Sequence, residues 1–127
     1  MASQVLLNLL DQLRRLPREA ATVEFKLNWD KPEDIGGYLS ALANAAALER
    51  CDRAWVVWGV EGATHEVKGT SFDPFAAKGE GNQSLTMWLT QLTSPRPDFK
   101  FHDLAHPNGR VVMLEIHPPR FAPLAFK

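Results

Sequence analysis

The sequence predicts an α+β domain with about three helices and a mixed, mainly antiparallel sheet. Three observations support this class. Amphipathic stretches at helical spacing alternate with short strand-like stretches, one apolar run has no polar face, and an Asn-Gly pair joins two strand-like runs near the end of the chain. The chain has 127 residues, of which 45% are hydrophobic, and this suits a domain that folds around its own core. Residues 1–127 are therefore expected to form a single domain.

The first half of the chain is predicted to form a helix, a strand, a second helix and a second strand. Residues 4–15 place leucines at helical spacing, and residues 22–27 alternate apolar and polar side chains as a half-buried strand does. Residues 35–50 carry an apolar stripe that is rich in alanine, which suits close packing on a sheet. Residues 53–60 are apolar on both faces and predict a central strand that is covered on both sides.

The second half is predicted to contain two hairpins and a third helix. Residues 65–69 are expected to pair with the central strand, and Asn82 is expected to cap a helix that runs to about Leu92. Two further strands, residues 99–104 and 110–117, flank the Asn-Gly turn. The proline-rich tail is expected to be extended.

Charge and cysteine content exclude several classes of protein. Fourteen Lys+Arg against fifteen Asp+Glu give a net charge of -1, so any nucleic-acid site must be a local patch and not a broadly basic surface. The single cysteine, Cys51, excludes a disulfide framework and a multi-cysteine zinc site, and it fits a reducing compartment. No uncharged apolar run is long enough to span a membrane. The sequence thus predicts a cytoplasmic protein.

Two carboxylates and a lysine near the first strand form a candidate catalytic group. Glu24 and Lys26 lie two residues apart on that strand and point the same way, and Glu19 lies just upstream. Converging carboxylates can hold Mg²⁺ or Mn²⁺ while a lysine steadies a phosphate, and Glu61 after the central strand is a candidate third ligand. The alternative is an ordinary solvated strand face with one charge pair.

Several basic and aromatic side chains are candidates for binding nucleic acid. Cations neutralise phosphates, and exposed rings stack on bases. The basic candidates are Arg14, Arg15, Arg18, Lys26, Lys31 and Arg53, and the aromatic candidates are Trp29, Tyr38 and Trp55. The alternative is ordinary surface charge, since residues 1–63 hold seven Lys and Arg against nine Asp and Glu. No phosphate-binding loop and no histidine pair at zinc-ligand spacing occurs in the sequence.

Several motifs in the sequence resemble those of one protein family. Residues 19–26 (EAATVEFK) resemble the opening motif of the Schlafen-type AlbA-like DNA-binding domain family. The helix ending in Ala-Asn, the apolar strand ending in Gly-Val-acid and the following hairpin also resemble that family, in residues 38–44, 57–61 and 64–70. The likeness continues, in the order of the bacterial subgroup, through residues 78–83, 88–92 and 94–99.

The resemblance implies a nucleic-acid-binding domain, with DNA as the favoured target, in a bacterial-type transcriptional regulator. Family members usually join this domain to a C-terminal winged-helix or ATPase-like region. They also continue past the final Pro-x-x-Phe with another strand, whereas this chain stops at Phe126-Lys127. We therefore expect the chain to be the N-terminal fragment of a longer protein.

Two other functions stay open at this point. In the animal relatives the same fold cleaves transfer and ribosomal RNA with two glutamates five residues apart, which Glu19 and Glu24 match. The acid after the central strand corresponds to Glu61, and Gly62 stands where the family has a second acid. This resemblance implies a Mg²⁺- or Mn²⁺-dependent endoribonuclease that acts on structured RNA. The other function is a protein-interaction or homodimerisation domain anchored by an exposed tryptophan among Trp29, Trp55 and Trp88.

Overall fold

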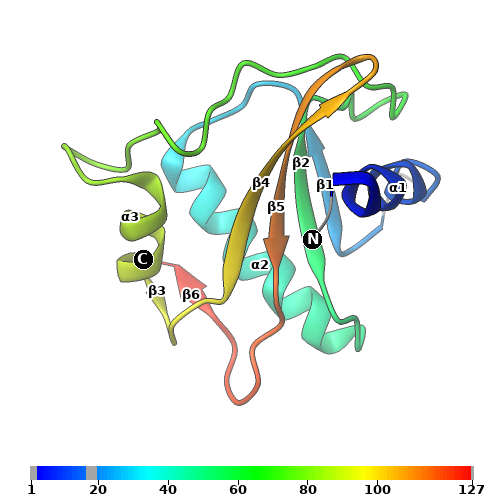
Figure 1. Cartoon of the computed structure of the whole chain (residues 1–127). Coiled ribbons are helices and arrows are strands. Elements are labelled where there is room, and N and C mark those ends of the chain that lie inside the picture. Colours follow the sequence, from blue (N-terminus) through cyan, green and yellow to red (C-terminus); the bar gives the residue numbers. More distant parts are fainter. Residues whose placement is uncertain (1–2, 17–19, 127) are drawn as a thin grey trace.

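The computed structural model describes residues 3–16 and 20–126, and its main element is a four-stranded sheet (Figure 1). The order of the strands is β1-β2-β5-β4. Strands β1 and β2 are parallel, and β2–β5 and β5–β4 are antiparallel. The strands are β1 (Val23–Lys26), β2 (Ala54–Trp58), β4 (Phe99–His106) and β5 (Gly109–Ile116). The predicted α+β class with a mixed, mainly antiparallel sheet is confirmed.

Helices cover both faces of this sheet. The helices are α1 (Ser3–Leu13), α2 (Pro32–Leu48) and α3 (Leu85–Leu92). Helix α1 lies on one side of the sheet and α2 on the other (Figure 1). The apolar stripe of α2 packs with α3 against one sheet face, and the leucines of α1 pack against the other. All five residues of β2 are buried because this central strand has a helix on each side. None of the helices within residues 3–16 and 20–126 combines the length and the apolar character that crossing a bilayer requires.

The alternation of side chains along the strands divides the core into two clusters. Val56 and Trp58 of β2 face α2, whereas Trp55 and Val57 face α1. The edge strand β1 follows the same rule, since Val23 packs on the α1 side. Glu24 and Lys26 therefore lie on the α2 side of the sheet.

One local prediction was wrong, and two others were incomplete. Residues 65–69 form no strand and contribute an isolated bridge between Val60 and Val67. The cap of α3 is Ser84, whose hydroxyl accepts from the Met87 N–H, and not Asn82. The tail does end in extended backbone, but its pairing was not predicted: β6 (Ala125–Phe126) pairs with β3 (Thr93–Ser94) in a small second sheet beside α3.

A tight backbone crossing explains why residues 65–69 leave the sheet. Gly59 directly follows β2 and has a φ of 101°, a conformation that favours glycine. Its carbonyl accepts from the N–H groups of both Lys68 and Gly69, at 2.7 and 3.0 Å. These bonds turn the chain back across the end of β2, so the segment cannot continue a regular ladder.

Candidate functional site

The carboxyl ends of β1 and β2 bring two loops to the same edge of the sheet. Parallel strands end side by side, and the Gly59 N–H donates to the Lys26 carbonyl at 2.8 Å. The loop that follows β1, residues 27–31, therefore lies beside the turn that follows β2, residues 59–62. We refer to residues 27–31 as the β1–α2 loop.

Lys26 marks the base of this loop and carries a stabilised charge. Its Nζ lies 3.4 Å from Glu24 Oε1 and 5.0 Å from the centre of the Tyr38 ring of α2. The Tyr38 hydroxyl and the Glu24 carboxylate raise the pKa of Lys26 above its usual value, although partial burial opposes the shift. Lys26 is therefore positively charged, and its ammonium group is held beside Tyr38 in the N-terminal half of α2.

Trp29 is the middle residue of the β1–α2 loop, and 52% of its surface is exposed. Its carbonyl accepts from Nε1 of the buried Trp58 at 2.7 Å, and its own Nε1 donates to the Asp34 carboxylate in the first turn of α2. Asn28 Oδ1 accepts from Thr70 Oγ1 at 2.8 Å, which ties the loop to a third segment. The loop is therefore held on both sides of Trp29.

An open hollow of about 530 Å³ lies along this loop. Lys31 stands at its rim, and its Nζ is 5.8 Å from the centre of the Trp29 ring. The residues that line the hollow are Phe25, Lys26, Leu27, Asn28, Trp29, Asp30, Lys31 and Gly62. The arrangement offers an aromatic face, an apolar floor and two ammonium groups, which together suit a flat ring that carries a phosphate.

The structure brings only some of the predicted basic residues together. Lys26 and Lys31 line the same hollow. Arg53 precedes β2, five residues before Trp58, so about 16 Å of strand separates it from the loop. Its Nε donates to Glu115 Oε2 at 2.7 Å. Arg18 lies outside the described residues.

The predicted metal-binding carboxylates are not gathered in the part of the chain that the structure describes. Glu24 pairs with Lys26, and Glu61 Oε2 accepts from the Thr64 hydroxyl at 3.2 Å. Across residues 3–16 and 20–126, no three His, Cys, Asp or Glu side chains are arranged to hold a metal ion. Glu19 lies outside these ranges, so the Mg²⁺ or Mn²⁺ site formed with it stays a prediction.

Two of the predicted aromatic contacts belong to the core. Trp55 is 4% exposed and Trp88 is 5% exposed, so neither can stack on a base or anchor a partner. Trp55 packs under α1, and Trp88 of α3 packs edge-on against Phe126. The tryptophan that stands out is therefore Trp29.

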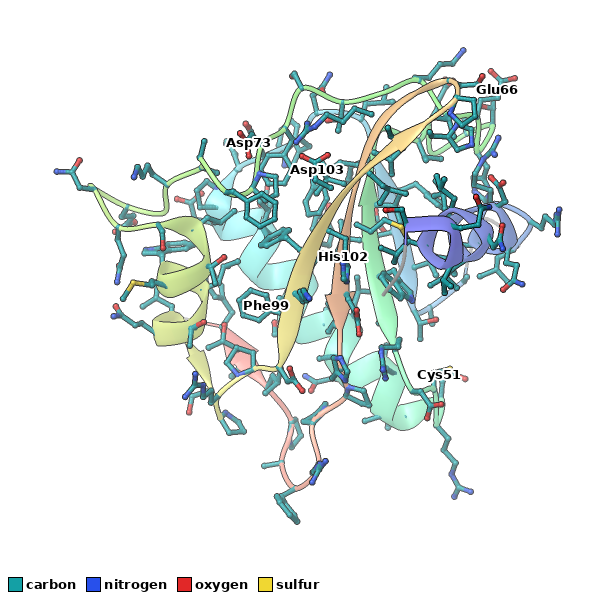
Figure 2. All side chains as sticks on the ribbon, in the orientation of Figure 1. Cys51, Glu66, Asp73, Phe99, His102 and Asp103 are labelled. Atoms are coloured by element: carbon teal, nitrogen blue, oxygen red, sulfur yellow. The ribbon has the colours of Figure 1, made fainter. Side chains whose placement is uncertain are left out.

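The sequence analysis missed a buried polar cluster on the α1 side of the sheet. The Glu115 carboxylate of β5 is bonded by Arg53, by His102 Nε2 of β4 at 2.8 Å and by His117 Nε2 at 2.9 Å; His102 is labelled in Figure 2. Burial alone raises the pKa of Glu115, but the bonds from His102, Arg53 and His117 outweigh it, so the pKa lies below its usual value. A lone acid in an apolar strand, two residues before a histidine, was the available signal.

Comparison with solved structures shows the fold. The structure of the N-terminal domain of a RecG-related protein from Nitrosomonas europaea superposes with a TM-score of 0.64 at 18% identity, over 100% of this chain and 82% of that one. The DIP2311 protein of Corynebacterium diphtheriae gives a TM-score of 0.53 at 14% identity, over 97% of this chain and 24% of that one.

A family model supplies the classification. No curated protein matches the chain. The family model described as "Schlafen, AlbA_2" matches residues 19–127. This range begins at the opening glutamate motif and includes every strand of the main sheet. The chain therefore belongs to the Schlafen AlbA_2 family.

Proposed function

We propose that this domain binds nucleic acid through the β1–α2 loop. The observation that carries the proposal is the hollow that exposed Trp29 lines together with two lysines, Lys26 and Lys31. Aromatic rings beside cations are the combination that contacts bases and phosphates at once. The specific form of the proposal, favoured by the family resemblance, is DNA binding within a transcriptional regulator. The N. europaea relative is itself named as related to an ATP-dependent DNA helicase.

Replacing Lys31 with alanine tests this surface. Lys31 is exposed and its ammonium group lies over the Trp29 ring, whereas Lys26 is held by Glu24 and Tyr38 and its loss would disturb the fold. We expect Lys31→Ala to weaken binding by about 3- to 10-fold at about 50 mM salt and to lower the salt slope by about 0.7–0.9, the value for one phosphate. Fluorescence anisotropy with labelled single-stranded and duplex DNA measures both quantities.

The matched control is Lys100→Ala, an exposed lysine on β4 at the opposite edge of the sheet. We expect its affinity to equal that of the wild type. Failure of the wild-type domain to bind either form of DNA at low salt would overturn the proposal. An equal loss of affinity in Lys31→Ala and Lys100→Ala would show that the β1–α2 loop is not the binding surface. Cleavage of transfer RNA in Mn²⁺ that is lost in Glu24→Gln would replace binding with catalysis.

A further inference from the structure

We infer that the β1–α2 loop is a stacking platform for an unpaired nucleobase, so that the domain prefers single-stranded nucleic acid to duplex. The inference rests on the proposed function and specifies its ligand. Its basis is the Trp29 ring: how far the ring is exposed, how firmly it is held, and which charges surround it.

Trp29 differs from the other three tryptophans of the chain. Trp55, Trp58 and Trp88 are between 1% and 5% exposed, whereas Trp29 is 52% exposed. An indole left in water on a loop forgoes the stabilisation that burial of its ring would give. Leu27 lines the same hollow and is 39% exposed, so the hollow offers a ligand apolar as well as aromatic surface.

The ring is held in place before any ligand arrives. The buried Trp58 indole donates to the Trp29 carbonyl at 2.7 Å, and the Trp29 indole donates to Asp34 at the start of α2. The Ser71 N–H and the Thr70 hydroxyl both donate to Asn28 Oδ1, at 2.9 and 2.8 Å. A ring fixed in this way loses little further freedom when a base stacks on it.

The charges around the ring select against duplex DNA. Residues 24–34 hold two lysines against four acids, namely Lys26 and Lys31 against Glu24, Asp30, Glu33 and Asp34. A duplex presents two phosphate backbones and keeps its base faces inside its own stack, so it requires a surface with a surplus of positive charge. A single strand exposes its base faces, and stacking can supply its affinity with only one or two phosphate contacts. Lys31, whose ammonium lies 5.8 Å from the ring centre, is placed for one of these contacts.

The exposure of Trp29 allows a direct test by fluorescence, because the other three indoles are buried. The probes are an oligothymidine and an oligouridine of about 15 nucleotides and the duplex of the same thymidine strand. We expect the single strands to bind at least about 5-fold tighter than the duplex and to quench the tryptophan emission. Trp29→Phe is expected to abolish the quenching and to keep affinity within about 3-fold, because the phenyl ring still stacks.

Trp29→Ala is expected to weaken single-strand binding by about 10-fold and duplex binding by no more than about 2-fold. Its far-ultraviolet circular dichroism and melting temperature, matched to those of the wild type, show that the variant is folded. Equal affinity for single strand and duplex, or single-strand binding without quenching, overturns the inference while binding itself stands. Absence of binding to all three probes overturns the proposed function. Preference for thymidine or uridine identifies DNA or RNA as the source of the base, and either outcome supports the inference.

Discussion

Gly59→Ala is expected to lower the free energy of unfolding by about 3 kcal/mol, because its backbone conformation and its surroundings both exclude a side chain. Gly59 has a φ of 101°, which L-residues rarely adopt. A methyl group on its Cα would lie 2.8 Å from the Arg110 carbonyl oxygen, which is backbone and cannot swing aside. Thermal or urea denaturation measures the loss, and about 10 °C is the expected fall in melting temperature.

The matched control is Gly37→Ala on α2. Gly37 is an exposed helical residue, and a methyl group there meets nothing within 4 Å. Alanine favours the helix over glycine, so this variant is expected to gain up to about 1 kcal/mol. If Gly59→Ala and Gly37→Ala had the same melting temperature, the turn that follows β2 would not have the conformation described above. The N–H of Gly59 also donates to the Lys26 carbonyl at the base of the β1–α2 loop. Because a methyl group at residue 59 would force this backbone to shift, a folded Gly59→Ala protein is expected to bind nucleic acid more weakly.

Glu115→Gln is expected to destabilise the domain by about 1–3 kcal/mol at neutral pH. The glutamine keeps the size of the side chain but removes the charge to which Arg53, His102 and His117 are bonded. The loss falls below that of a fully buried ion pair, because the Arg53 side chain is 39% exposed and water can solvate it. Urea denaturation of wild type and variant at pH 7 measures the difference.

The pH dependence of that difference follows from the pKa of Glu115. In the folded state this pKa lies below its ordinary value of 4.5. The carboxylate therefore adds stability at pH above about 4.5, and this contribution disappears as the pH falls through the folded-state pKa. We expect wild type and Glu115→Gln to converge in stability as the solution is made acidic.

Glu66→Gln serves as the control, because Glu66 forms an exposed ion pair with Lys68. We expect this variant to match the wild type at neutral pH. If the free energy of unfolding of Glu115→Gln stayed below that of the wild type by the same amount down to strongly acidic pH, the cause would be lost packing and not lost charge.

The elements with strong local patterns could be predicted from the sequence. The run of residues 53–60 predicted a strand buried on both faces, and β2 lies at the centre of the sheet with a helix on each side. The Asn-Gly pair predicted a turn between β4 and β5, and the turn lies there, with Pro107 and Asn108 between the paired His106 and Gly109. Both features depend on neighbours in the chain, so local rules suffice for them.

The features that failed depend on distant contacts. Strand β6 has two residues and exists because β3, about thirty residues earlier, offers it an edge. Asn82 and Ser84 are both good caps, and the packing of Leu85 and Trp88 in the core decides that the helix begins after Ser84. The Glu115 cluster was missed because two of its partners, Arg53 and His102, come from distant parts of the chain.

The candidate site could be predicted from the sequence only where it depends on residues that are close along the chain. Trp29 stands among polar residues, in Asn28-Trp29-Asp30-Lys31, and this context fits an exposed ring, whereas Trp55 stands in an apolar run and is buried. Lys26 and Lys31 share a hollow because one strand and its loop carry both. The separation of Arg53 from them follows from the direction of β2, which only the sheet topology reveals.

The strand order β1-β2-β5-β4 has a consequence for the rate of folding. The β4–β5 hairpin closes through a short turn, but the central pairing joins residues 54–58 to residues 112–116, more than fifty residues apart. Bringing these segments together costs chain entropy before any contact between β2 and β5 can form. We therefore expect the β4–β5 hairpin to form early and the β2–β5 pairing to limit the rate of folding.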